Sequence, residues 1–394
     1  MRLLHTSDWH VGRAIRGRSR TQEYAAALDQ VVQIAISEGV DGVLVAGDLY
    51  EHRSAAPEAD ALVFEIFVRL HEAQIPVVAL AGNHDSPVRF EAFAGLLAKI
   101  GVDMVPRVEK PDEGGVVELA ARDGSETARI VCVPFVPERR FGDAAALFDA
   151  GERWHLNYAE GMGNLLGAMA TGFRPGAVNV LMGHLFTDGA MVTAGGGERE
   201  LTIGMTYAVS PSRLPADASY IALGHVHKPQ PVKGSPATAR YAGSLLQLDF
   251  GEAGQDKSVC IVDVHPGKPA KVREIPITAG RRLRDARGTI DALESMAAQA
   301  GEDYLRVFVQ TDGPVPGIAD RVREALPNAL DVHIEYERPE LAGQEVQAVS
   351  SLHPRDQFVA YFETEHGTAP GESIMEAFDE TLELETESDL PEGA

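Results

Sequence analysis

Cysteine is almost absent from this sequence: Cys132 and Cys260 are the only two in 394 residues. Each lies inside a β-branched apolar run, so we expect buried free thiols rather than a disulfide or a metal role. Long hydrophobic runs are also missing, since none approaches the roughly 20 residues that a membrane-spanning helix requires. No signal-peptide pattern follows Met1. These absences predict a cytoplasmic protein.

Positive charge is scarce as well, because 35 Lys and Arg stand against 59 Asp and Glu, a net charge of -24. At first this balance argues against a nucleic-acid partner, since cationic contacts with phosphate dominate DNA binding. The acids are unevenly spread, however. Between Glu363 and Ala394 there are eleven acidic residues and no Lys or Arg. Almost half of the surplus therefore lies in a tail that need not touch a substrate.

Length and composition predict two or three folded units, with a hydrophobic share of 44% that is typical of globular proteins. Residues 1–280 alternate strand-like and helix-like segments, in the manner of an α/β layered domain. Helices are expected at about 21–38, 58–73 and 88–100, long enough for the crossovers between parallel strands. Strands are expected at 3–5, 42–46, 77–81, 129–133, 178–182, 220–223 and 258–264.

Residues 281–338 alternate strand-like and helix-like segments, which predicts a small α/β unit. It carries no cluster of ligand-type residues, so we expect a cap on the first domain and not an independent enzyme. Two amphipathic helices follow, at about 354–364 and 372–384, and they cannot bury their apolar faces alone. They dock on the body of this chain or, as we favour, on a partner protein. The segments beyond the cap are a linker at 339–352, a helical segment at 353–384 and an acidic disordered tail at 385–394.

Five short motifs rich in metal-ligand residues fall where predicted strands end. In α/β sheets such strand ends meet in one crevice, so segments far apart in sequence come together there. Residues two apart in an extended chain point the same way, which would aim Asp8 with His10, and His225 with His227, into that crevice. A glycine before the ligand residue allows a sharp turn and a close approach. The motifs are Asp8-Trp9-His10, Gly47-Asp48, Gly82-Asn83-His84-Asp85, Gly183-His184 and Gly224-His225-Val226-His227.

The donor set predicts two divalent cations. Carboxylate, amide-carbonyl and imidazole ligands suit Mn²⁺, Mg²⁺, Fe²⁺ or Zn²⁺ and exclude a thiolate site. Seven such side chains are too many for one ion and about right for two ions that share a carboxylate.

In this order the motifs resemble those of the calcineurin-like metallophosphoesterases. The residues within the motifs are similar to those of the SbcD group of bacterial nuclease subunits, which is related to the archaeal and eukaryotic Mre-type nucleases. The segments that carry the resemblance are Leu4-His5-Thr6-Ser7-Asp8-Trp9-His10-Val11-Gly12, Gly47-Asp48-Leu49-Tyr50, Gly82-Asn83-His84-Asp85-Ser86 and Gly224-His225-Val226-His227. The resemblance implies a four-layer α/β/β/α sandwich with a small α/β capping domain that binds DNA and C-terminal partner-binding helices.

The resemblance also implies a role for each residue. Asp8, His10 and His227 would hold the first metal, and Asn83, His184 and His225 the second. Asp48 would bridge the two ions, with Mn²⁺ as the first candidate and Mg²⁺ as the second. His84 would steady the transition state or protonate the leaving 3′ oxygen. His52 would orient His84 or touch phosphate, unless it is an ordinary solvated loop residue.

Two further groups have a functional and a structural interpretation. His5 lies within the first strand, where a core or supporting histidine is a better interpretation than a ligand. Four arginines without an acid follow the first motif, on a loop leaving the expected site. They would grip DNA phosphates without reading sequence, or they form an ordinary solvated loop. They are Arg13, Arg16, Arg18 and Arg20.

Two kinds of assembly are expected. Residues 58–73 and 88–100 carry apolar side chains on more faces than one sheet can cover, which favours a homodimer over a layer buried beneath the cap. The family resemblance implies a second partner, an SbcC-type coiled-coil ATPase. No Gly-rich phosphate loop with Lys-Ser/Thr occurs here, so ATP would be handled by that partner.

The function predicted from the resemblance is a metal-dependent DNA nuclease. It would act as a 3′ to 5′ double-strand exonuclease and a single-strand and hairpin endonuclease, in DNA repair and recombination. A phosphoprotein phosphatase would use the same metal centre, but such enzymes typically continue Gly-Asp with Asp-Arg-Gly and Asn-His with Glu, where this chain has Tyr50-Glu51-His52-Arg53 and Asp85. A small-molecule phosphodiesterase and a non-catalytic scaffold of the same fold are also compatible with the fold class.

Overall fold

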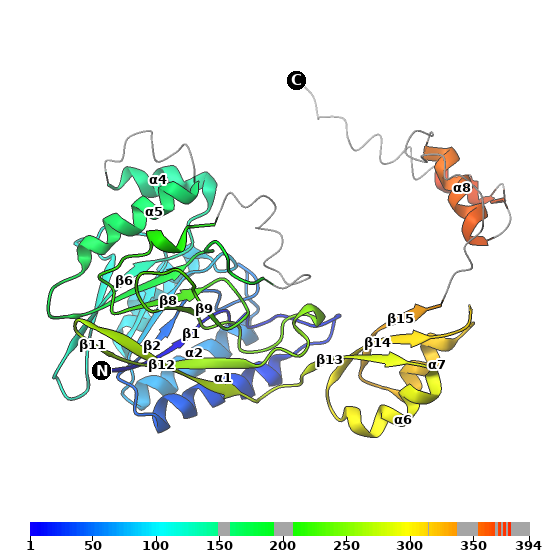
Figure 1. Cartoon of the computed structure of the whole chain (residues 1–394), viewed down its shortest axis with the longest axis horizontal. Helices are drawn as coiled ribbons and strands as arrows, with labels where there is room; N and C mark the ends of the chain where they lie inside the picture. Colours follow the sequence, from blue (N-terminus) through cyan, green and yellow to red (C-terminus); the bar gives the residue numbers. More distant parts are fainter. Residues whose placement is uncertain are drawn as a thin grey trace. The chain divides into compact units, whose positions relative to one another are not determined.

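The computed structural model describes residues 1–148, 158–192, 208–313, 315–336 and 354–366, together with three short pieces at 369–371, 373–375 and 377–379. The chain forms two units, Met1–Tyr336 and Glu337–Ala394. The first unit contains two six-stranded sheets and one three-stranded sheet (Figure 1).

The first sheet has the strand order β12-β11-β1-β2-β3-β4. Its four strands β1 to β4 run parallel, as the long helical crossovers between them require, and β11 is antiparallel to β1. The strands are β1 Arg2–Thr6, β2 Gly42–Val45, β3 Val77–Leu80, β4 Val102–Val105, β11 Lys257–His265 and β12 Lys268–Ile277. The crossover helices are α1 Thr21–Ser37, α2 Pro57–Glu72 and α3 Pro87–Leu97.

The second sheet has the order β5-β6-β7-β8-β10-β9, with β6, β7, β8 and β10 parallel. Its strands are β5 Val116–Ala120, β6 Thr127–Val133, β7 Val178–His184, β8 Tyr220–Gly224, β9 Gln230–Pro231 and β10 Ala239–Tyr241. Its helices are α4 Phe141–Ala146 and α5 Tyr158–Met169. Short 3₁₀ turns lie at Ala98–Ile100, Glu138–Arg140, Ala170–Gly172, Pro211–Arg213 and Phe250–Glu252.

Three apolar clusters show that these elements form four layers. Successive residues of a strand face opposite sides of a sheet, and here each side has its own core. Leu4 packs under α1 and α2, whereas its neighbour Leu3 packs between the two sheets. In the second sheet Ala222 faces the core between the sheets and Leu223 faces α5. The predicted α/β/β/α sandwich is therefore confirmed, with helices on both outer faces.

Most of the apolar side chains of α2 are buried by this packing. Val63, Ile66 and Phe67 are buried in the cluster that α1, α2 and α3 form on the first sheet. They lie against the sheet and not beneath the cap. The large apolar side chains left exposed on α2 and α3 are Val68, Val88 and Leu96. The surplus on which the expected dimer rested is therefore smaller than the sequence pattern indicates.

The three-stranded sheet forms a small α/β layer that begins where β12 ends. All three of its strands are parallel. This layer packs on the two-sheet sandwich through a small apolar cluster of Ile15, Phe250, Leu283 and Tyr304. The Tyr304 hydroxyl also donates to Glu23 of α1. Its elements are β13 Leu283–Gly288, α6 Ile290–Ala300, β14 Tyr304–Gln310, α7 Ile318–Ala325 and β15 Ala329–Glu335.

The second unit contains helix α8, Pro354–His366. Phe358 stacks on Phe378 with ring centroids 4.2 Å apart, and Arg355 pairs with Asp379 at 3.0 Å. The pieces 373–375 and 377–379 are helical. Most of the helix expected at 372–384, like the expected linker at 339–352 and tail at 385–394, lies outside the described residues.

Several elements were not expected from the sequence. Among the described residues these are strands β4, β5, β9, β10 and β12 and helices α4 and α5. The strands lie at or near sheet edges, where a short or polar segment gains its pairing from a neighbour and needs no strong pattern of its own. Both cysteines are buried and free, as predicted. No helix of the described chain has the length and apolar character that a membrane crossing demands.

Candidate metal centre

The candidate ligands gather at the carboxyl ends of five parallel strands from both large sheets. Asp8 follows β1, Asp48 follows β2, and Asn83 follows β3. His184 is the last residue of β7, and His225 follows β8. Because the two sheets face each other, their strand ends meet at one edge of the sandwich.

The backbone of this edge is unusual, because four of the ligand residues have positive φ angles. They are Asp8 at 50°, His10 at 49°, Asp48 at 52° and His225 at 96°. The Asp8 and His225 motifs therefore do not keep the extended geometry that would aim both side chains of each pair the same way. Such backbones cost of order 1–3 kcal/mol each and persist only when their surroundings fix them. Here the loops after β1 and β2 are joined by hydrogen bonds, from Asp8 N to Gly47 O at 2.9 Å and from His10 N to Asp48 O at 3.0 Å.

Glycines allow the loops to approach each other. An added Cβ at Gly47 would lie 2.1 Å from His184 Nδ1, and one at Gly224 would lie 1.9 Å from the carbonyl oxygen of Ala46. At Gly82 the added atom would meet Asp48, 2.1 Å from Oδ1 and 2.4 Å from the backbone nitrogen. Only Gly47 among these also has a positive φ, at 95°. Close approach, more than sharp turning, therefore explains these glycines.

One group of donor atoms comprises those of Asp8, His10 and His227, which all lie within 4.8 Å of one another. The His10 and His227 rings are 4.9 Å apart, edge to face. All three side chains are buried. These are the residues that the family resemblance assigned to the first ion.

A second group surrounds the side-chain oxygen of Asn83. His225 Nδ1 lies 2.9 Å from Asn83 Oδ1, and His184 Nε2 lies 3.0 Å from the same atom. Asp48 lies between the groups, with Oδ2 3.4 Å from His184 Nε2 and 3.6 Å from His10 Nε2. Donors around one cation at about 2.1 Å are themselves about 3 to 3.5 Å apart, so these spacings suit a shared cation site.

The imidazole hydrogen bonds leave lone pairs that face the cluster. His10 Nδ1 is 2.9 Å from Glu51 and His184 Nδ1 is 2.8 Å from the Ala46 carbonyl oxygen, so both rings donate outward through Nδ1. His10 Nε2 is buried without a hydrogen-bond partner. A buried polar atom in that state is costly unless another group satisfies it. A divalent cation would do so, and the residues present therefore fit one.

The electrostatics of the cluster show the same demand for positive charge. Burial would lower the pKa of His184, but the Asp48 carboxylate outweighs burial and raises the pKa of His184 to about 9. Burial, together with the charge of His184, lowers the pKa of His225 to about 3. A proton on His184 thus offsets part of the carboxylate charge, and a bound cation would have to displace that proton.

His84 is positioned by the loop that follows β2. Its backbone nitrogen donates to Asp48 Oδ1 at 2.8 Å, and its Nδ1 donates to the Glu51 carbonyl oxygen at 2.8 Å. Its ring lies 4.7 Å from that of His10. The Glu51 carbonyl therefore orients His84, which corrects the expectation that His52 does so. His52 is exposed on the same loop, which is compatible with a phosphate contact and with an ordinary solvated loop residue.

Supporting carboxylates were missed by the sequence reasoning. Glu51 accepts from His10, and Glu252 accepts from His227 Nδ1 at 3.2 Å and from Lys257 Nζ at 2.6 Å. Asp85 accepts from the backbone nitrogens of Leu49, Tyr50 and Gly82 at 3.2, 3.1 and 2.9 Å. Glu51 had a signal, being three residues after Asp48; Glu252 had none.

The four arginines of the loop after the first motif have different environments in the structure. Arg20 is buried, and it binds the Gln247 carbonyl and pairs with Glu23 at 2.9 Å. It is therefore a core residue, and its expected contact with DNA is wrong. Arg13 pairs with Glu51 at 3.2 Å, next to the site. Arg16 pairs with Asp249 and with Asp331 of the cap, and Arg18 donates to the Pro327 carbonyl.

His5 is a structural residue, as the sequence favoured. Its side chain is fully buried, and its Nδ1 lies 2.9 Å from the Tyr220 hydroxyl. Burial lowers the pKa of His5 to about 3, so the ring is neutral.

Two family models match the chain. The calcineurin-like phosphoesterase family covers residues 1–229, and the type 5 capsule protein repressor C-terminal domain covers residues 279–366. The first match spans more than half of the chain and contains every candidate ligand. Together with the sandwich fold and its cluster, it defines the class: this is a calcineurin-like phosphoesterase.

Curated relatives narrow the class further. The D subunit of the SbcCD nuclease of Bacillus subtilis is 30% identical over 388 residues, 96% of this chain and 97% of that protein. Its counterpart in Rhodobacter capsulatus is 30% identical over 366 residues, 87% and 89% of the two chains. The Escherichia coli K12 protein is 28% identical over 382 residues, 91% and 92%. The chain belongs to the SbcD family of nuclease subunits and is a phosphodiester hydrolase.

Gly82→Ala tests the close approach of the β2 and β3 loops. The new methyl group would overlap the Asp48 backbone, which is held by its neighbours, so we expect Asp48 to shift and the chain to bind divalent metal more weakly than the wild type. Overpacking of this kind costs about 1–3 kcal/mol of stability. Gly167→Ala on α5, where an added Cβ meets nothing within 4 Å, is the control and should gain slight stability. Wild-type metal binding in Gly82→Ala would contradict this account of the site.

Proposed function

We propose that this chain is a two-metal DNA nuclease, on the strength of one observation. Oxygen and nitrogen donors from five strand ends converge around the buried Asp48 carboxylate, in a chain that belongs to a family of nuclease subunits. Asp8, His10 and His227 hold one cation and Asn83, His184 and His225 the other, with Asp48 between them. Mn²⁺ is the cation we favour, because mixed carboxylate, amide and imidazole ligands suit it, and Mg²⁺ is the second candidate.

When bound, the cation pair supplies Lewis acidity for an in-line displacement at phosphorus. The chain's own residues then position the metal-binding rings and the DNA, and they protonate the leaving oxygen. His84 keeps its Nδ1 proton on the Glu51 carbonyl, which leaves Nε2 free to hold a second proton for the leaving oxygen. Glu51 and Glu252 fix the His10 and His227 rings by accepting from Nδ1. His52, Arg13, Arg16 and Arg18 lie in loops beside the site and would contact DNA phosphates.

The substrate we propose is a DNA end or hairpin, cut by 3′ to 5′ double-strand exonuclease and single-strand endonuclease action in repair and recombination. A protein active on DNA ends would be associated with the nucleoid. The loop after β2 supports a nuclease over a phosphoprotein phosphatase, because no second aspartate follows Asp48 there. Instead Glu51 accepts from His10, and Arg13 of the β1 loop donates to Glu51. The cap at 281–338 supports a large substrate over a small-molecule phosphodiester.

Incubation with Mn²⁺ and hairpin DNA, a phosphopeptide or a cyclic nucleotide tests this proposal. We expect the DNA to be cut and the two remaining substrates to survive. Asp48→Ala should abolish cleavage because it uncouples the two cation sites. His84→Gln should bind two Mn²⁺ ions yet cut at least about 100-fold more slowly, the usual scale of general acid catalysis. Dephosphorylation of the peptide with intact DNA would refute the nuclease, and loss of metal from His84→Gln would refute the separate role of His84.

We also propose a homodimer through the exposed apolar side chains of α2 and α3. Val68 is 43% exposed, Val88 63% and Leu96 66%. Side chains of this kind are more stable when a second copy covers them. Sedimentation at micromolar concentration should therefore show a dimer, and Leu96→Glu should shift it to monomer. A wild-type monomer would exclude this interface.

The second unit is our candidate for docking an SbcC-type ATPase. The stack of Phe358 on Phe378 joins α8 to the piece 377–379, and Phe358 also contacts Phe362 within α8. Tyr361 and Ile374 remain 61% and 40% exposed, which leaves apolar surface for a partner helix.

Deletion of residues 353–394 tests that assignment. The truncated chain should lose ATPase-partner binding in a pull-down and keep Mn²⁺-dependent cleavage of single-stranded DNA, since every candidate ligand precedes residue 228. The full-length chain is the control. Partner binding by the truncated chain would show that the contact lies elsewhere, and loss of cleavage would show that the segment supports the nuclease domain.

A further inference from the structure

A cavity of about 380 Å³ opens beside the metal centre. Gly82 and Asp85 of the β3 loop line it, and Phe135 lies on its wall. Phe135 also stacks on His225, with centroids 6.0 Å apart and planes inclined by 26°. Its backbone nitrogen donates to the Ala81 carbonyl oxygen at 3.0 Å, which ties the end of β6 to the end of β3. The cavity and the cation cluster therefore share a wall.

Three arginines of this cavity are distinguished by what they lack. Within the described residues, Arg53, Arg139 and Arg140 are the arginines whose guanidinium groups have no hydrogen-bond or ion-pair partner, and all three line this cavity. The fourth arginine of the lining, Arg107, pairs with Glu91 at 2.7 Å. In a chain with a net charge of -24, three free guanidinium groups around one cavity indicate an anionic ligand.

The rest of the lining is largely apolar. Besides the neutral Ser86, the residues are Pro87, Val88, Pro106, Val108, Val136, Pro137, Ala144 and Leu147. The acids are Asp143, which is exposed, and Asp85, whose carboxylate is already occupied by backbone nitrogens. An apolar wall with guanidinium groups at the rim matches a ligand that has both a flat ring and a phosphate.

We propose that this cavity binds one nucleotide of the DNA strand next to the phosphate that is cut. The base packs on the apolar wall, and its phosphate lies on Arg53, Arg139 and Arg140. Such contacts tolerate any sequence, because every base has an apolar face and every nucleotide a phosphate. This assignment rests on the proposed nuclease function and deepens it, since it gives the site a way to distinguish a polynucleotide from a small phosphodiester.

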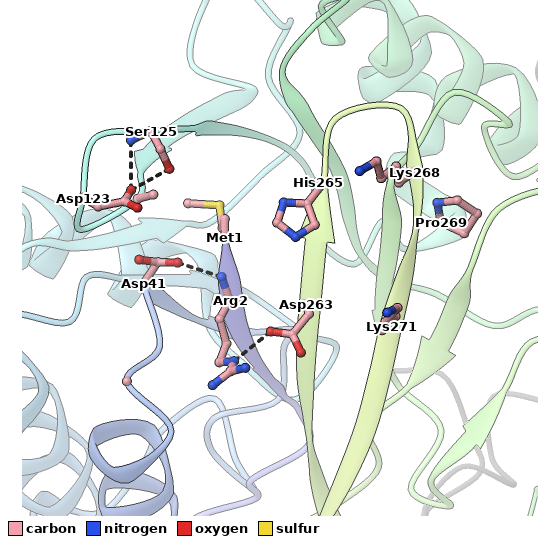
Figure 2. Close-up of a pocket in the computed structure, with 12 residues that line it drawn as sticks. Met1, Arg2, Asp41, Asp123, Ser125, Asp263, His265, Lys268, Pro269 and Lys271 are labelled. Carbon is pink, nitrogen blue, oxygen red and sulfur yellow. Dashed lines mark hydrogen bonds and ion pairs between the residues drawn. The ribbon is translucent and has the colours of Figure 1, made fainter.

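A second cavity supplies a matched control. It has a volume of about 580 Å³ and lies at the amino ends of β1 and β2 (Figure 2). The metal centre lies at the carboxyl ends of these strands, the opposite edge of the sandwich. Its acids are engaged, since Asp41 accepts from the Arg2 backbone at 2.7 Å and Asp263 from the Arg2 side chain at 2.7 Å. Lys268 and Lys271 line it and are exposed, so they can be removed as a pair without touching the site.

The test compares two substrates in the full-length chain with Mn²⁺: a single-stranded oligonucleotide and bis(p-nitrophenyl) phosphate. For Arg139→Ala/Arg140→Ala we expect the ratio of kcat/KM on the oligonucleotide to kcat/KM on the ester to fall by about tenfold or more, through KM. The slope of log affinity against log salt should become less steep by up to about 0.7, because one phosphate loses most of its cationic partners. Arg139→Lys/Arg140→Lys should recover part of the loss, and Lys268→Ala/Lys271→Ala should leave the ratio unchanged.

The outcomes separate this proposal from the function beneath it. If the wild type cuts the oligonucleotide and the Arg139→Ala/Arg140→Ala variant keeps the wild-type ratio, the nucleotide site is wrong and the nuclease stands. If the kcat/KM ratio fell equally in Lys268→Ala/Lys271→Ala, the loss would be explained by the lower overall positive charge, and the nucleotide site would also be wrong. If the wild type cuts the ester and never the oligonucleotide, the nuclease function itself fails.

Discussion

The structure depends on a buried carboxylate at the point where two sheets meet. Asp48 is 1% exposed, and Asp8, which is fully buried, lies in the same crevice. Two carboxylates cannot share a water-poor site unless positive charge accompanies them. In the side chains alone that charge is a proton held on His184, whose pKa Asp48 raises to about 9. Bound divalent metal would satisfy the same requirement and also the Nε2 of His10, which has no hydrogen-bond partner.

The sandwich explains how the crevice is built. Alternate residues of each central strand enter different cores, so the sheets are clamped on both faces and their strand ends cannot separate. That rigidity maintains the left-handed backbones of Asp8, His10 and Asp48, which the loops alone would not adopt. The same edge bears the cavity lined by Arg53, Arg139 and Arg140. Chemistry and strand binding would thus share one rigid surface.

The sequence predicted what is local and missed what depends on the fold. The candidate ligands were visible because each follows an apolar strand, and the central strands and the three long helices were visible for the same reason. Glu252 was invisible, since its proximity to His227 is produced only by folding. Arg20 appeared to be a loop arginine because burial of a loop leaves no pattern. Extended geometry at Asp8 was the natural expectation for a strand end, and only the contacts between loops override it.

The central claim is tested most directly by measuring how many Mn²⁺ ions bind and whether their electron spins are coupled. Titration of the metal-free chain, followed by electron paramagnetic resonance, should give two ions per chain with the spectrum of a spin-coupled pair. Asp48→Ala should lose that coupling, because no carboxylate then joins the two groups of donors. A single ion per wild-type chain, or two ions without coupling, would contradict the claim that one buried carboxylate organises the site.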